Sequence, residues 1–379
     1  MFITSIEALI IKIPGRWGES RRPAPHACPE AGCQRLETVL ARVTTDEGVA
    51  GWGESQATSA PEVAGAIIHS ILKPALEGKP FGGTGLEIET LWDAMYHHTR
   101  TSGQTGGFML DAMAAVDIAL WDLGGRIHGA SIASLIAGGG AKRKLETYVD
   151  RVTGETVDER IENAAAYHAA GCRRFKIAYD SSRRELLENY DALARICGAE
   201  NVAVDGRWRV DPARSAQLAG ELDRRGALWL ARPFAADDAA AHAALAARCS
   251  TPIAVGETHR SRAELAPFFR AHAMRIVQPD LGRCGITEGL RIARTAKREG
   301  MEIAPRLSSA LGPLLFATLQ FAAAVPNCRF APYAPGLVET ANGFVTEPVQ
   351  FSKGCYAVPQ GPGLGVELVE PEVRLVAVA

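Results

Sequence analysis

The chain has 379 residues, of which 47% are hydrophobic and 22% are charged, a composition typical of globular proteins and long enough for two domains. Its formal net charge is only −2 at pH 7 and it carries no long basic run, so we expect a small-molecule ligand rather than nucleic acid or a membrane surface. The eight cysteines are scattered without a CxxC pair, which argues against a zinc site and a disulfide framework and favours the cytoplasm.

The first part of the chain predicts an α+β domain over residues 1–130. Residues 3–13 alternate apolar and polar side chains, which predicts a strand rather than a signal peptide or a membrane span. Strand-like segments follow at 38–44 and 49–53, joined by a tight turn, and helical stretches extend to about residue 129. The irregular segment 14–34 is rich in Pro, Gly and Arg, and we interpret it either as a lid over a ligand site or as a disordered segment.

From about residue 145 onward, short apolar runs alternate with helical stretches at a spacing of roughly 25 residues, which is typical of βα units. Thr156, Ser182 and Ser261 each stand three residues before a glutamate, a pattern that predicts a capping box at a helix start. Seven units and an eighth strand near 327–333 predict a (β/α)7β barrel of the TIM type over residues 140–335. We expect the segment 340–379 to return to the first domain, which would cap the barrel.

The candidate site lies at the carboxyl ends of the predicted strands, because that is where the chemistry of such barrels is placed. Charged residues or a histidine follow most of these strands. In chain order they are Lys176, Asp205, Arg207, Arg232, Glu257, His259, Asp280 and Arg306. Three carboxylates and several cations are therefore expected to converge.

These features resemble the enolase superfamily, in its mandelate racemase and muconate lactonizing enzyme branch. The resemblance covers nearly the whole chain and rests on GWGES at 51–55, AAVDIALWDLGGRIHG at 114–129, PIAVGET at 252–258 and IVQPDLGRCGITEGLRIA at 276–293. It implies abstraction of the proton α to a carboxylate, with Mg²⁺ stabilising the enolate. The implied activity by descent is that of a dehydratase (a lyase) or a racemase or epimerase (an isomerase) of small hydroxy or sugar acids.

The resemblance also implies three carboxylate metal ligands, one on each of three successive strands. Asp205 and Glu257 match the first and third, but the second position is Ala231, in the segment WLARP. Because Mg²⁺ prefers octahedral oxygen coordination, we expect it to bind here weakly or not at all.

The bases implied by the resemblance are altered as well. The family's KxK appears as Lys176-Ile177-Ala178, and Arg306 stands where a histidine paired with Asp280 is expected. An arginine stays protonated and cannot act as a neutral imidazole does. The remaining candidates for proton transfer are Lys176, Asp280 and His259.

We hypothesise that the arginines compensate for these losses. Arg207, Arg232 and Arg306 could pair with Asp205, Glu257 and Asp280 in place of the metal, or bind a substrate carboxylate. Two functions remain open: a sugar-acid enzyme, and a catalytically silent barrel that binds an anion or serves in an assembly. The resemblance also implies a homo-oligomer.

Overall fold

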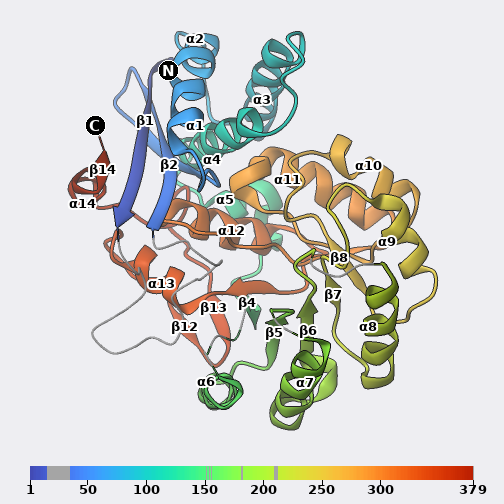
Figure 1. The fold of residues 1–379 in the computed structure, drawn as a ribbon. Helices are drawn as coiled ribbons and strands as arrows, with labels where there is room; N and C mark the ends of the chain where they lie inside the picture. The colour runs from blue at the N-terminus through green and yellow to red at the C-terminus, as the bar shows by residue number, and fades with distance from the viewer. Residues whose placement is uncertain are drawn as a thin grey trace.

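A computed structural model describes residues 1–14, 35–150, 152, 154, 156–180, 182–208 and 212–378 (Figure 1). The segment predicted to be a lid therefore lies outside the described residues, apart from Pro14 at the end of the first strand. In the described part of the chain, no helix is both long and apolar enough to cross a membrane.

The capping domain is built on an antiparallel sheet. Its described strands are β1 (Ile3–Pro14), β2 (Arg35–Thr45), β3 (Ala50–Ser55) and β14 (Ala377–Val378), in the order β14-β1-β2-β3. The turn between β2 and β3 is closed by the amide of Thr45, which donates to the carbonyl of Val49 at 3.0 Å, and Gly48 there has a φ of +80°. Glycine adopts this left-handed conformation without a steric cost, as the tight hairpin predicted from the sequence requires.

Helices cover this sheet on the side that faces the barrel (Figure 1). They are α1 (Pro61–Ile67), the π-helical turn η1 (Ile68–Leu72), α2 (Lys73–Leu76) and α4 (Phe108–Ile127), while α3 (Gly85–Arg100) packs on α4 and α5 (Ile132–Ala137) packs on the barrel. The long apolar helix α4 lies directly on β3. A Cβ atom at Gly51 would stand 2.3 Å from the carbonyl oxygen of Ala119, and one at Gly53 would stand 1.9 Å from that of Ala115. The two glycines of GWGES thus allow the backbones of strand and helix to touch.

The barrel is a closed ring of parallel strands. Its strands are β4 (Lys144–Val149), β5 (Arg174–Ala178), β6 (Val202–Asp205), β7 (Leu230–Ala231), β8 (Ile253–Val255), β9 (Ile276–Val277), β10 (Glu302–Ile303) and β11 (Ala331–Tyr333). β11 pairs with β4, and the bridge between Ile303 and Cys328 joins β10 to the segment before β11. The predicted closure of the ring is therefore confirmed.

A helix follows each of the first seven barrel strands in the described part of the chain. These helices are α6 (Val157–Ala169), α7 (Arg183–Cys197), α8 (Pro212–Arg225), α9 (Ala239–Ala246), α10 (Arg262–Arg270), α11 (Leu281–Arg298) and α12 (Pro313–Ala324). Thr156 forms the predicted reciprocal capping box with Glu159. At Ser261 only one half forms, because the Glu264 carboxylate accepts instead from the amide of Arg260 at 2.7 Å. The (β/α)7β order is that of a TIM-type barrel with one helix fewer.

The barrel interior is apolar at its centre and polar at the carboxyl end of its strands. The central layer is Tyr148, Ala203, Leu228, Trp229, Ala231, Ala254, Ile276, Ala304 and Phe330, all buried. Side chains alternate between the two faces of a strand, so residues two positions after members of this layer also point inward. Gln278 and Arg306, which follow Ile276 and Ala304 in this way, therefore line the mouth.

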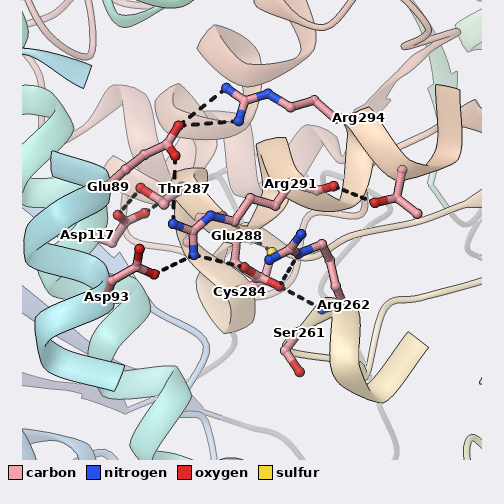
Figure 2. Close-up of polar contacts among 12 residues, drawn as sticks. Glu89, Asp93, Asp117, Ser261, Arg262, Cys284, Thr287, Glu288, Arg291 and Arg294 are labelled. Carbon is pink, nitrogen blue, oxygen red and sulfur yellow. Dashed lines mark hydrogen bonds and ion pairs between the residues drawn. The ribbon is translucent and has the colours of Figure 1, made fainter. Parts of the chain in front are cut away.

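Cap and barrel meet along helices α3, α4 and α11 (Figure 2). The Thr287 hydroxyl on α11 donates to Asp117 on α4 and accepts from the indole of Trp121 at 2.9 Å. Arg291 on α11 reaches Asp93 on α3 at 2.8 Å, and Figure 2 shows this guanidinium between the acids of α3 and Glu288. The interface thus combines an apolar helix contact with a network of polar pairs.

After the barrel the chain forms α13 (Pro335–Asn342), the hairpin of β12 (Phe351–Ser352) and β13 (Cys355–Ala357), and α14 (Glu370–Leu375). β13 pairs antiparallel with β4, and β14 at the end of the tail pairs with β1 (Figure 1). The tail therefore touches the barrel first and the capping sheet last.

Candidate active site

The charged residues predicted from the sequence lie mostly in one buried cluster at the barrel mouth. Lys176 lies on β5, Asp205 ends β6, Arg232 follows β7 directly, and Glu257 and Arg306 follow β8 and β10. Each position is set by the strand that carries it, because neighbouring parallel strands end at the same edge of the ring.

Arg232 lies between two carboxylates. Its Nε donates to Asp205 Oδ1 at 2.7 Å, a terminal nitrogen contacts the other oxygen of Asp205, and Nη1 is 2.5 Å from Glu257 Oε1. All three side chains are buried, with exposed fractions of 3 to 4%. The planar guanidinium therefore meets Asp205 in a bidentate pair while bridging to the next strand.

The backbone around this pair adopts the left-handed conformation at three non-glycine residues. Arg207, Trp208 and Arg232 have φ values of 52°, 56° and 51°. Such values are uncommon for residues with a Cβ and cost of order 1–3 kcal/mol each, so surrounding contacts must hold them. One such contact is the Trp208 ring, which stacks on the Arg232 guanidinium at 4.3 Å from the ring centroid.

Asp150, which the sequence reasoning missed, completes the cluster. It follows β4 directly, and its Oδ1 is 2.5 Å from the Lys176 ammonium group, which also lies 3.9 Å from Asp205. Arg306 pairs with Glu257, and its Nε lies 4.0 Å from Asp150 Oδ2. The sequence did contain a signal that could have identified Asp150, because the aspartate of LETYVD stands at the end of a predicted strand, as the other acids do.

The cluster balances its own charge. Asp150, Asp205 and Glu257 supply three negative groups, and Lys176, Arg232 and Arg306 supply three positive ones. Burial would raise the pKa of Asp205, but Arg232, Lys176 and Arg306 together hold it below its usual value. For Glu257 burial prevails over the two arginines and raises its pKa. No further cation is needed to neutralise the three acids.

β7 contributes no oxygen ligand to this cluster. Ala231, at the position where the family resemblance implies a metal ligand, ends β7 with its methyl group buried in the barrel interior. Within the described ranges, no group of three or more His, Cys, Asp or Glu side chains is arranged to hold a metal ion. The oxygens of Asp205 and one oxygen of Glu257 are ion-paired to arginine instead.

Among the described residues, Asp280 does not pair with an arginine, contrary to our hypothesis. Its Oδ1 accepts from the Gly282 amide at 3.0 Å, which caps α11, and its Oδ2 accepts from the Ser308 hydroxyl. Burial raises its pKa, and the charges of Arg283 and Arg306 oppose this effect. Ser308, two residues beyond Arg306, is therefore the side-chain partner of Asp280 in place of the expected arginine.

His259 does not join the cluster. Its ring packs edge-on against Phe268 of α10, with ring centroids 5.0 Å apart. Burial lowers the pKa of His259 to about 4, and the charges that act on it come from His242, Arg260 and Asp237. Because Glu257 and His259 are only two residues apart, the sequence suggested that both side chains lie in the cluster. The Glu257 side chain points to the arginines, whereas the His259 ring points to Phe268.

Arg207 lies at the rim. Its backbone amide donates to Asp205 Oδ1 at 3.0 Å, while its guanidinium pairs with Asp180, whose side chain is 45% exposed. The three arginines grouped in the sequence reasoning therefore differ. Arg232 pairs with the two buried acids Asp205 and Glu257. Arg306 pairs with Glu257 on the inner wall of the barrel, and Arg207 pairs with Asp180 near solvent.

Comparison with known proteins is consistent with this architecture. The family profile described as "Mandelate racemase / muconate lactonizing enzyme, N-terminal domain" matches residues 16–137, and the one described as "Enolase C-terminal domain-like" matches residues 159–372. The chain is 29% identical to the D-galactarolactone cycloisomerase of Agrobacterium fabrum, over 92% of this chain and 94% of that protein. It is 31% identical to the D-galactonate dehydratase of Verminephrobacter eiseniae, over 88% and 89% of the two chains.

A solved structure of an enolase superfamily member from Agrobacterium tumefaciens has the same fold. It superposes with a TM-score of 0.89 at 27% identity and covers 99% of this chain and 98% of its own. Together with the profiles, these relatives show that the chain belongs to the mandelate racemase and muconate lactonizing enzyme family of the enolase superfamily.

Proposed function

We propose that this chain binds a small hydroxy acid or sugar acid at the barrel mouth without Mg²⁺, and that the Arg232 guanidinium stands in the place of the cation. The observation that carries the proposal is the buried bridge of Arg232 between Asp205 and Glu257. These two acids match the family's metal-ligand positions, and here a permanent cation already pairs with both.

The donor set does not fit a Mg²⁺ ion. Mg²⁺ takes oxygen ligands in near-ideal octahedral geometry, whereas β7 offers a methyl group and both carboxylates hold a guanidinium. Binding of the ion would displace Arg232 from its two partners. A buried charge that loses its partners is costly, at about 3–5 kcal/mol for one broken pair.

The family and the cationic residues support an acid ligand. The relatives named above are a dehydratase of a sugar acid and a cycloisomerase of a sugar-acid lactone. Arg207 is the nearest of the three arginines to solvent through its partner, because Asp180 is 45% exposed while the Arg207 side chain itself is 13% exposed. Arg306 offers a second guanidinium deeper in the mouth, and arginine binds carboxylates bidentately.

By descent, the reaction would be a lyase or isomerase reaction that begins at the proton α to the carboxylate. Lys176 is positioned as a hydrogen-bond donor and as a positive charge near a developing enolate, and Asp280 remains a candidate for proton transfer. His259 is a weaker candidate because its ring packs against Phe268.

A second candidate function is a catalytically silent barrel that binds an anion or takes part in an assembly. It is favoured by Ala178 and Arg306, which occupy the two positions where the family resemblance implies a base. We further propose a cytoplasmic homo-oligomer that does not engage nucleic acid or membranes, which agrees with the near-zero net charge.

Calorimetric titration of chelator-treated protein tests the proposal. We expect no saturable Mg²⁺ binding, but saturable binding of D-galactonate that weakens at least tenfold in Arg306→Ala, a loss of about 1.4 kcal/mol. Arg184→Ala, at a helix surface position that is 89% exposed, is the matched control and should bind like the wild type. Tight Mg²⁺ binding would refute the metal-free site, and absence of acid binding would refute the ligand class.

Proton NMR of the bound acid in D₂O separates the two candidate functions. Exchange of the α-proton with solvent would support an enzyme, whereas binding without exchange would support the silent barrel.

A further inference from the structure

Two polar atoms at the barrel mouth are buried and have no hydrogen-bond partner among the described residues. They are Oε2 of Glu257 and Nε2 of Gln278. The side chains that carry them are buried, with exposed fractions of 4% and 1%. Buried polar groups are nearly always hydrogen-bonded because an unpaired one is costly, so two of them in one site require an explanation.

The two side chains belong to neighbouring strands. The amide of Gln278 donates to the carbonyl of Val255 at 2.8 Å, which places the end of β9 beside the end of β8. Gln278 points inward because it follows Ile276 of the central layer by two residues. Glu257 also points inward, since its Oε1 meets Arg232 and Arg306.

Arg306 lies on the other side of Gln278. It follows β10, the next strand around the ring, and its backbone amide donates to Pro279 at 3.0 Å. Around the barrel wall the order is therefore Glu257, Gln278, Arg306. The two side chains with unpaired atoms therefore follow the two strands that precede β10 around the ring, and Glu257 pairs with the Arg306 guanidinium that we propose binds a ligand carboxylate.

An unpaired acceptor and an unpaired donor on neighbouring strands together complement a hydroxyl group, which can donate one hydrogen bond and accept another. A ligand carboxylate is disfavoured at this position because it would face Glu257, and an ammonium group is disfavoured because it cannot accept from an amide. We propose that Glu257 and Gln278 form a recognition site for a ligand hydroxyl, and that with Arg306 they select α-hydroxy acids over the corresponding deoxy acids. The inference rests on the proposed function, since it names the second group of the same ligand.

The test compares two acids that differ by one hydroxyl group. By calorimetry, wild-type protein should bind D-galactonate about tenfold more tightly than 2-deoxy-D-galactonate, because a site built to hydrogen-bond a hydroxyl leaves buried groups unpaired when the hydroxyl is missing. Gln278→Met keeps the size of the side chain but removes the donor. In this variant the preference should fall below threefold while the deoxy acid still binds as in the wild type.

Gln350→Met replaces an exposed glutamine on the surface and should keep the full preference. Equal affinity of the wild type for the two acids would overturn this inference alone, because it would mean that the two polar atoms hold only water. Binding of neither acid would overturn the proposed function and the hydroxyl site with it. The wild-type comparison needs no variant, so the result does not depend on how Gln278→Met folds.

Discussion

At the scale of single residues, Arg232 is the shared ion-pair partner that stabilises two buried acids in the folded protein. Replacing it with alanine leaves Asp205 and Glu257 without their shared partner, so Arg232→Ala should lower the free energy of unfolding by about 3–5 kcal/mol. Urea unfolding followed by tryptophan fluorescence measures this loss. Arg184→Ala removes an exposed arginine and should change the value by less than about 0.5 kcal/mol.

A double variant tests whether the guanidinium replaces a metal ion. Ala231→Glu/Arg232→Ala places carboxylates at or just after the ends of β6, β7 and β8, the chemistry that Mg²⁺ prefers. Its urea midpoint should rise when Mg²⁺ is added, since an ion that binds only the folded state stabilises it. The wild type should not respond. An equal response of both proteins would contradict the replacement.

The sequence predicted which residues converge here and that arginines pair with the acids, but not which arginine pairs with which acid. Lys176, Asp205, Glu257 and Arg306 could be placed because strand ends share one edge. The pairing of Arg232 depends on a left-handed backbone at that residue, which its side chain does not favour and which the sequence does not reveal. Asp280 was assigned the wrong kind of partner for a similar reason, because the path of the loop after β10, which brings Ser308 to Asp280, is not revealed by the sequence.

At the scale of elements, the contact between α4 and α11 contains a carboxyl group that titrates near neutrality. Burial raises the pKa of Asp117 from its ordinary value of 3.8 to about 7, although Thr287 donates to both of its oxygens. The folded protein therefore holds this proton more tightly than the unfolded chain does. The resulting stabilisation is fully present below about pH 4 and is lost as the pH rises through 7.

The stability of the wild type should therefore contain a term that falls by up to about 1.4 kcal/mol per pH unit between pH 4 and 7. Asp117→Asn cannot titrate, so the difference in unfolding free energy between wild type and variant should follow this slope. Urea unfolding at half-unit steps from pH 4.5 to 8 measures it. A difference that is constant with pH would show that Asp117 keeps its ordinary pKa.

At the scale of the whole molecule, the end of the chain closes the capping domain. Val373 of α14 is fully buried against Leu9, Ile11 and Trp52 in one apolar cluster, whereas Leu375, two residues later, is 78% exposed. Val373→Ala should lower the free energy of unfolding by about 1–3 kcal/mol, from lost burial and the cavity left behind. Leu375→Ala, its matched control, should lie within about 0.5 kcal/mol of the wild type. Equal effects would mean that the tail does not pack on the cap.

The barrel was predictable from the sequence because each of its units repeats the same local signals. Apolar runs recur in every unit, and several units add a helix cap such as Thr156 or a glycine after the helix, so one misplaced boundary does not change the predicted ring. The short hairpin of β12 and β13 on β4 was not predicted, since pairing between segments about 200 residues apart leaves no local signal. The contact of cap and barrel through Thr287 and Asp117 is equally non-local.

The balanced charges at the barrel mouth also bear on how this site can change during evolution. A single mutation that restores glutamate at position 231 would add a fourth acid to a cluster whose three cations are already matched, while Arg232 still fills the space between Asp205 and Glu257. A single mutation that removes Arg232 would leave two buried acids unpaired. On the proposal of a metal-free site, each single substitution toward three carboxylates therefore gives a less stable protein, so Arg232 opposes a stepwise change to a metal-binding site.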